Sequence, residues 1–142
     1  MELAGNHFNK MALKQLFLMG KMADNTTDDA RQGCASYMVQ AWQKRDVEKL
    51  KIIAYFSYPT FTYSEYDSTN QLLKKIVDEK EFVDTLVSEM DEARRMNKRI
   101  RMRLMEENGE YYVDVMIADK MSTFKFIYGE KSLIGIDRYW ES

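Results

Sequence analysis

The last third of the chain alternates apolar and polar residues over four consecutive stretches, and this pattern constrains the fold more than any other. Residues 98–140 read KRIRMRLMEENGEYYVDVMIADKMSTFKFIYGEKSLIGIDRYW. Alternation with a period of two is typical of strands that have one buried face. Asn108 and Gly109 supply the positive φ that a tight hairpin needs. The sequence therefore predicts four consecutive antiparallel strands, which the upstream residues must cover on one side.

The alternation also assigns side chains to the two faces of this predicted sheet. Ile100, Met102 and Leu104 point to the face that we expect helices to cover. The side chains that point to the opposite face of the same strand are Arg99, Arg101 and Arg103. In the later strands both faces are apolar or aromatic, and the residues we assign to the uncovered patch are Phe124, Phe126, Tyr128, Ile134, Ile136 and Trp140. Since large exposed apolar patches mark interaction sites, these six residues form the predicted interface.

Apolar residues at helical spacing predict the helices that cover the sheet. The expected helical ranges are 9–21, a long stretch that starts at 25–29 and runs past Trp42, a shorter one over 47–54, and 79–96 with Asp78 as its cap. A period of two predicts one further strand over 60–66. The spacing of Leu72, Leu73, Ile76 and Val77 predicts a short helical piece before the main helix. The result is an α+β fold in the order α-α-α-β-α-β-β-β-β, with a sheet of about five strands.

Length and composition limit the class of protein. The chain has 142 residues, of which 45% are hydrophobic and 31% charged, and its formal net charge is −2. We expect one domain over 26–142, preceded by an amphipathic helical extension over 1–25. No apolar run approaches the ~20 residues of a membrane span. Cys34 is the single cysteine, so the sequence carries no disulfide signature, and we expect a cytoplasmic protein.

Most catalytic and metal-binding constellations are missing from the sequence. His7 is the single histidine, which excludes Ser-His-Asp, Cys-His and multi-histidine sites within the chain. Neither of the common glycine-rich phosphate-binding motifs occurs. The acidic residues of the main helix lack the spacing and central glycine of a calcium loop. We therefore expect no metal and no cofactor.

A basic run around the first strand of the sheet has two interpretations. Its exposed arginines, Arg99, Arg101 and Arg103, are suited to contacting phosphates. They also suit the solvated face of an edge strand, where positive charge discourages aggregation, and acids such as Asp114 or Glu106 could pair with them. Because the chain as a whole is acidic, we favour the second interpretation and expect no nucleic acid partner.

Aromatic residues spread along the chain define a candidate ligand pocket. The residues are Trp42, Tyr58, Tyr63, Tyr111 and Tyr139, with Asp114 as an acid that could transfer a proton if desolvated. Aromatic walls with phenol hydroxyls suit a small apolar ligand. The simpler interpretation is that these side chains fill the core.

The element order and the stretch AWQKRDVEKLKIIAYFSYPTFTY resemble the nuclear transport factor 2-like superfamily over residues 26–140. The resemblance implies a cystatin-like cone in which helices pack into a curved antiparallel sheet. Members include enzymes of the ketosteroid isomerase and polyketide cyclase types, whose pockets use an acid with tyrosine or histidine partners. Others are noncatalytic binding or dimerisation domains, which often dimerise through the outer face of the sheet. No pocket histidine is present here, which argues against the enzymatic branch.

The prediction from sequence is a noncatalytic protein-association domain, either a homodimer or a subunit of a larger assembly. It rests on the apolar second face of the sheet and on the broad apolar stripe over 9–21. The alternative is a small-molecule enzyme or binder of the ketosteroid isomerase or polyketide cyclase type that uses the aromatic pocket.

Overall fold

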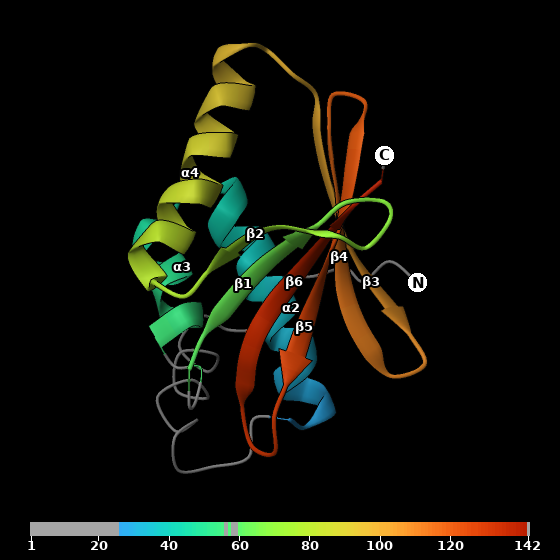
Figure 1. The fold of residues 1–142 in the computed structure, drawn as a ribbon. Coiled ribbons are helices and arrows are strands. Elements are labelled where there is room, and N and C mark those ends of the chain that lie inside the picture. Colours follow the sequence, from blue (N-terminus) through green and yellow to red (C-terminus); the bar gives the residue numbers. More distant parts are fainter. Residues whose placement is uncertain (1–25, 56, 58–59, 142) are drawn as a thin grey trace.

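The computed structural model describes residues 26–55, 57 and 60–141. Within these ranges the chain forms three helices and six strands (Figure 1). Their bounds are α2 (Asp28–Gln43), α3 (Val47–Tyr55), β1 (Thr62–Tyr66), β2 (Leu72–Ile76), α4 (Glu79–Arg95), β3 (Ile100–Glu107), β4 (Glu110–Ile117), β5 (Lys120–Tyr128) and β6 (Leu133–Trp140). The predicted helix over 9–21 and His7 lie outside the described residues.

The six strands form one mixed sheet in the order β2-β1-β6-β5-β4-β3. Every neighbouring pair is antiparallel except β1 and β6, which run parallel with Thr62 opposite Gly135 and Tyr66 opposite Tyr139. The three helices lie together on one side of this twisted sheet (Figure 1). The α+β class and the helix-on-sheet arrangement predicted from sequence are confirmed.

Local capping sets where the helices begin, as the sequence predicts. The backbone N–H of Ala30 donates to the Thr27 hydroxyl at 3.3 Å, and the N–H of Glu81 donates to the Asp78 carboxylate at 3.0 Å. Each bond satisfies a donor that the first helical turn leaves without a partner. The predicted start of α4 is therefore confirmed at Glu79, and its end lies within a residue of the predicted Met96.

The hairpin between β3 and β4 is also confirmed. Asn108 and Gly109 have φ values of 54° and 80°, which matches a two-residue turn with both central residues left-handed. The register that follows sends Leu104, Val113 and Val115 into the core. The alternation thus correctly predicted that Leu104 points to the covered face of β3.

The segment before α4 differs from the prediction, because Leu72–Ile76 is strand β2 and not a helical piece. The turn that precedes it explains the difference. One Asp67 carboxylate oxygen accepts the backbone N–H groups of Thr69 and Gln71, both at 2.9 Å, and Asn70 adopts a φ of 63°. This closed turn returns the chain antiparallel to β1, so the strand count rises from about five to six.

The core lies between the helices and the sheet and is rich in aromatic rings. Trp42 of α2 meets Phe124 of β5 edge-on at 5.4 Å, and Tyr63 of β1 packs against Phe82 of α4 at 5.2 Å. The Trp42 indole N–H donates to the carbonyl of Leu86 at 2.7 Å, which joins α2 to α4. None of the described helices is long and apolar enough to span a membrane.

Candidate functional site

No described helix covers the side of the sheet that points away from the core, which we call the outer face (Figure 1). Its members alternate along each strand with residues such as Tyr63, Val113 and Phe124, which are buried on the helix side. The outer-face residues are Ser64, Tyr66, Arg101, Arg103, Met105, Tyr112, Asp114, Met116, Met121, Thr123, Lys125, Asp137 and Tyr139. Three tyrosines, three methionines and two arginines thus share this surface.

A stacked pair of tyrosines stands where β1 meets β6 on the outer face. The rings of Tyr66 and Tyr139 lie 5.0 Å apart and 14° from parallel, and the Lys125 ammonium lies 5.4 Å from the Tyr139 ring centre. The Tyr139 hydroxyl approaches the Asp137 carboxylate at 3.4 Å. Burial raises the pKa of both Asp137 and Tyr139 above their ordinary values. Asp137 and Tyr139 are therefore already partly desolvated in a single chain.

The opposite side of the outer face carries the arginines of β3. Arg101 and Arg103 are exposed, and Arg103 stands directly across from Asp114 of β4. The Thr123 hydroxyl donates to Asp114 at 2.8 Å. Arg94, which precedes these arginines at the end of α4, instead donates to the carbonyl of Gln43. The structure therefore does not gather the basic run into one phosphate-sized cluster.

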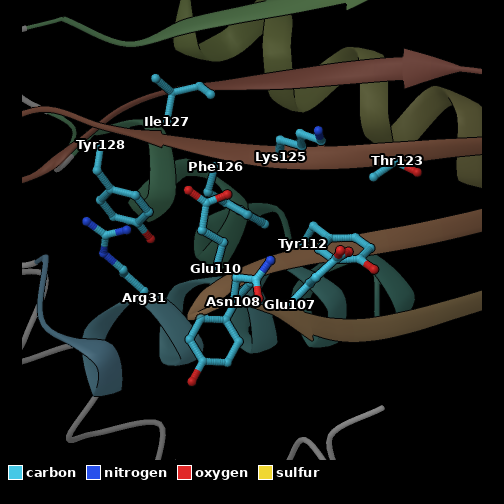
Figure 2. Close-up of a pocket in the computed structure, with 11 residues that line it drawn as sticks. Arg31, Glu107, Asn108, Glu110, Tyr112, Thr123, Lys125, Phe126, Ile127 and Tyr128 are labelled. Atoms are coloured by element: carbon cyan, nitrogen blue, oxygen red, sulfur yellow. The ribbon is translucent and has the colours of Figure 1, made fainter. Parts of the chain in front are cut away.

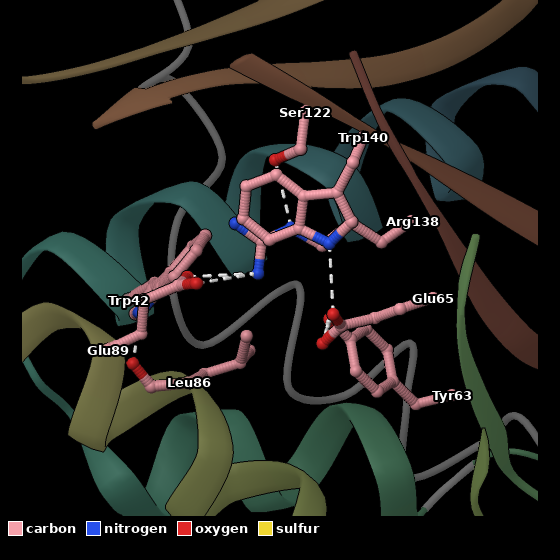
Figure 3. Close-up of polar contacts among 8 residues, drawn as sticks. All are labelled: Trp42, Tyr63, Glu65, Leu86, Glu89, Ser122, Arg138 and Trp140. Atoms are coloured by element: carbon pink, nitrogen blue, oxygen red, sulfur yellow. Dashed lines mark hydrogen bonds and ion pairs between the residues drawn. The ribbon is translucent and has the colours of Figure 1, made fainter. Parts of the chain in front are cut away.

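A buried polar cluster lies on the other side of the sheet, between β6 and α4 (Figure 3). Arg138, only 1% exposed, donates to the Ser122 hydroxyl at 2.9 Å and to the Glu89 carboxylate at 3.0 Å. Its guanidinium lies 4.0 Å from the ring centre of Trp140 and 4.5 Å from that of Phe124. The guanidinium of this ion pair is thus enclosed by aromatic rings, where charges are screened least.

Two further hydrogen bonds fix a second acid beside this cluster. The Tyr63 hydroxyl donates to Glu65 at 2.7 Å, and the Trp140 indole N–H donates to the same carboxylate at 2.9 Å (Figure 3). Burial raises the pKa of Glu89 in spite of the opposing effect of Arg138, and it also raises the pKa of Tyr63. An acid beside a tyrosine therefore exists in the interior, with the hydroxyl aimed at the carboxylate.

A cleft of about 870 Å³ opens at the end of the sheet where β4 and β5 separate (Figure 2). Its walls come from β4, β5, the β3–β4 hairpin turn and the first turn of α2. The lining residues are Arg31, Glu107, Asn108, Glu110, Tyr111, Tyr112, Thr123, Lys125, Phe126, Ile127 and Tyr128. The Arg31 guanidinium lies over the Tyr128 ring at 4.7 Å. The Tyr111 hydroxyl donates to Asp28 at 2.8 Å. Cations, acids and aromatic rings therefore all line this opening.

The candidate ligand pocket of the sequence analysis is not assembled by the fold. Trp42 and Tyr63 are fully buried in the core, whereas Tyr139 and Asp114 lie on the outer face of the sheet. Tyr111 lines the cleft between β4 and β5. Tyr58 lies outside the described residues. The interpretation that these aromatics fill the core holds for Trp42 and Tyr63, which meet Phe124 from two sides.

The six predicted interface residues are also divided. Phe124 and Ile136 are fully buried, and Phe126 and Tyr128 pack against the core, so the structure places these four on the helix side and not on the outer face. The reason is that side chains along a strand alternate between its two faces. The aromatic residues of β5 lie an even number of positions from the buried Ser122, so they point to the same face as Ser122. Trp140 joins the buried polar cluster, and Ile134 is half-buried at a groove beside Thr62.

Sequence reasoning missed several residues that the fold brings together. The stacked residues Tyr66 and Tyr139 belong to two strands that pair in parallel and are distant in sequence. Arg138 and Glu89 are 49 residues apart and share no local pattern. Among the described residues, no group of three or more His, Cys, Asp and Glu side chains is placed to hold a metal ion.

No protein-family model matches the chain, and no curated protein matches it. Among solved structures it is similar to an NTF2-like protein of unknown function from Cytophaga hutchinsonii, with 8% sequence identity and a TM-score of 0.49 over 78% of this chain and 88% of that one. It is also similar to a DUF4783 family protein from Bacteroides fragilis, with 11% identity and a TM-score of 0.42 over 73% of this chain and 95% of the other. An NTF2-like protein is thus among the structures that this chain resembles, as its element order predicts, and the likeness concerns the fold alone.

Proposed function

We propose that this chain is a noncatalytic protein-association domain that forms a homodimer through the outer face of its sheet. The observation that carries the proposal is the composition of that face, where tyrosine, methionine and arginine side chains gather. These residue types are enriched at protein interfaces relative to the rest of the surface. Arg138 and Glu89, in contrast, bind each other on the helix side of the sheet.

The stacked tyrosines provide a suitable centre for such an interface. Tyr66 and Tyr139 are half-buried and hold each other in place, so little side-chain entropy remains to be lost when a partner covers them. Around them, Thr123 and Asp114 have already satisfied each other by a hydrogen bond. A two-fold arrangement would place the same patch on both copies, which is the commonest symmetry of soluble oligomers.

Light scattering and sedimentation across a wide dilution series test this proposal. The expected mass is twice the 16.8 kDa of one chain at high concentration, with reversible dissociation on dilution. Exchange of the backbone amide hydrogens in β4, β5 and β6 should slow as the dimer forms, while exchange in α4 stays unchanged. A strict monomer at every concentration contradicts the proposal.

A second candidate, a small-molecule enzyme or binder of the ketosteroid isomerase type, is supported by the Tyr63 and Glu65 pair. A hydroxyl 2.7 Å from a carboxylate is suited to proton transfer next to a carbonyl group. Both side chains are buried, so a ligand must first displace packed residues. Isomerisation of a β,γ-unsaturated ketone, followed by absorbance, is the test, and turnover must disappear in Tyr63→Phe and Glu65→Gln. No turnover in the native protein excludes the isomerase, and no saturable binding of the ketone excludes the binder as well.

A further inference from the structure

The cleft in Figure 2 lies where the sheet forks, and the two arms of the fork keep different partners. β4 and β5 pair from Tyr112 opposite Lys125 to Ile117 opposite Lys120, and the pairing goes no further toward the open end. Beyond that point β5 continues beside β6 as far as Tyr128, and β4 remains paired with β3 as far as Glu110. Phe126–Tyr128 therefore have no strand partner on the β4 side among the described residues.

Separate contacts fix the two arms of the fork. On the β4 arm, Tyr111 donates its hydroxyl to Asp28 at the start of α2. On the β5 arm, the register shifts between Ile127 and Tyr128, and the Tyr128 ring lies against Arg31. A bulge of this kind increases strand twist and turns the strand away from its neighbour. The fork is therefore built by side-chain contacts with α2 and is not a chance opening between loops.

Alternate residues of a strand direct their backbone N–H and C=O groups to opposite sides, so some of these groups in Phe126–Tyr128 point to the β4 side, where no described strand pairs with them. A free strand edge is a template for another extended chain, because each such group can pair with a backbone group of the incoming strand. Ile127 is exposed, and Phe126 and Tyr128 are half-buried, so the edge is reachable from the cleft. A globular ligand would leave these backbone groups without partners, whereas an extended peptide satisfies them.

The cations that line the cleft are Arg31 and Lys125, and its acids are Glu107 and Glu110. Arg31 is the cation beside Tyr128, at the end of β5 that lies beyond its pairing with β4, and it indicates what a peptide at this edge would carry. The Arg31 Nε donates to the carbonyl of Thr26 at 2.8 Å, and among the described residues no carboxylate pairs with this guanidinium. The central carbon of the Arg31 guanidinium lies 4.7 Å from the Tyr128 ring centre, and a guanidinium is suited to a planar, bidentate partner. A carboxylate is the peptide group that fits this geometry.

We propose that the β4–β5 fork binds an extended peptide, which adds a short strand to the free edge of β5 and pairs a carboxylate with Arg31. The carboxylate belongs either to an acidic side chain or to the peptide's C-terminus. The fork adjoins the proposed dimer surface, because Tyr112, Thr123 and Lys125 line the cleft and also belong to the outer face.

Fluorescence anisotropy with designed peptides tests the proposal on the full chain. The probe is a fluorescein-labelled hexapeptide of alternating valine and threonine with one glutamate and an amidated C-terminus. In a second peptide glutamine replaces the glutamate, so no carboxylate remains. A third peptide has the same glutamine but a free C-terminus, so its one carboxylate is at the end of the chain. We expect saturable binding of one carboxylate peptide, about tenfold weaker binding of the amidated glutamine peptide, and loss of binding when alternate backbone nitrogens are methylated.

Variants and hydrogen exchange complete the test. Arg31→Gln should remove the preference for the carboxylate, whereas Lys80→Gln, which changes an exposed cation of α4, should preserve it. The bound peptide should slow amide exchange within residues 126–128. Binding that tolerates backbone methylation overturns strand addition, and so does the absence of saturable binding by both carboxylate peptides. Protection of residues 126–128 that rises with protein concentration without peptide assigns the fork to a second copy and also overturns the proposal.

Discussion

Arg138 carries its charge into the aromatic core, and the consequences can be predicted at the scale of this one residue. Its contacts reach Glu89, Ser122 and the ring of Trp140. Arg138→Met leaves Glu89 without its partner, and an uncompensated buried charge is strongly destabilising. We expect the free energy of unfolding to fall by about 3 kcal/mol, at the low end for buried pairs because the Glu89 side chain retains 27% exposure. Urea unfolding measures the loss.

A double variant separates the unpaired charge from the lost packing. In Arg138→Met with Glu89→Leu both charges are absent, and replacing a whole buried ion pair by apolar side chains is often neutral. Most of the stability should therefore return. As a control, Arg45→Met breaks the pair with Asp91, whose members are about half exposed, and it should cost much less. A double variant as unstable as Arg138→Met contradicts this account.

Asp67 should give the chain a local sensitivity to acid. Its pKa is lowered chiefly by the hydrogen bond from the Gln71 backbone and next by that from the Thr69 hydroxyl. A carboxyl group whose pKa is lowered by folding stabilises the folded state at any pH above the pKa that it has in the unfolded chain, about 3.8. This stabilisation is lost as the pH falls through the lower pKa of the folded state. The β1–β2 turn should therefore weaken below about pH 4.

Asp67→Asn is the matched variant, since its amide oxygen can accept the same hydrogen bonds without titrating. Urea unfolding from pH 6 to pH 2 should show a shallower loss of stability in Asp67→Asn than in the native protein. Identical slopes for the two proteins would show that Asp67 contributes nothing to the acid sensitivity.

At the scale of the elements, Gly135 permits the parallel pairing of β1 and β6. A Cβ at this position would lie 2.6 Å from the backbone carbonyl oxygen of Thr62, which the strand pairing fixes in place. Gly135→Ala must therefore push the two strands apart, and we expect a loss of about 2 kcal/mol or more in thermal or urea unfolding. Gly129→Ala is the control, because its Cβ would lie 3.0 Å from the side-chain atom Cγ2 of Ile134 and no closer than 3.8 Å to a backbone atom, the Ser132 carbonyl oxygen. Equal losses in the two variants would contradict the steric argument.

The elements also show where sequence reasoning succeeds. Helix starts at Thr27 and Asp78 and the turn at Asn108 and Gly109 depend on residues within four positions of each other, so the sequence contains the full signal. Strand β2 was misread as a helix because Leu72 and Leu73 are apolar yet 54% and 58% exposed. Their helical spacing therefore does not correspond to a buried face. The closed turn at Asp67 directs the following residues into a strand instead.

The candidate sites were harder to predict than the elements for a related physical reason. A face of a sheet is assembled by pairing between strands, and the β1–β6 pairing joins residues more than 70 positions apart. No local pattern specifies that Tyr66 and Tyr139 will stack. Likewise, the register of β5 with β4 and β6 determines which of its side chains are buried, and Phe124 is one of them. The sequence analysis predicted an interaction surface on the sheet but assigned four of its six residues to it wrongly, since these four pack on the helix side.

At the scale of the whole molecule, the sheet separates a packed interior from an outer face that no described helix covers (Figure 1). The proposed dimer would cover that face and complete a second layer on the sheet. Tyr139→Glu places a carboxylate next to Asp137 at the stacked pair, where a partner would exclude water. Since this interface would contain the residue twice, we expect the dimer to dissociate at least about 30-fold more readily, as measured by sedimentation equilibrium.

Tyr55→Glu makes the same chemical change on α3, at an exposed side chain on the helix side of the molecule. It should leave the dimer unchanged, because no part of the proposed interface includes that helix. Circular dichroism of both variants checks that the fold persists, which is expected because Tyr139 is half-exposed in the single chain. Dissociation caused by Tyr55→Glu and not by Tyr139→Glu would move the association surface to the helices, and it would leave the stacked tyrosines as a feature of the monomer alone.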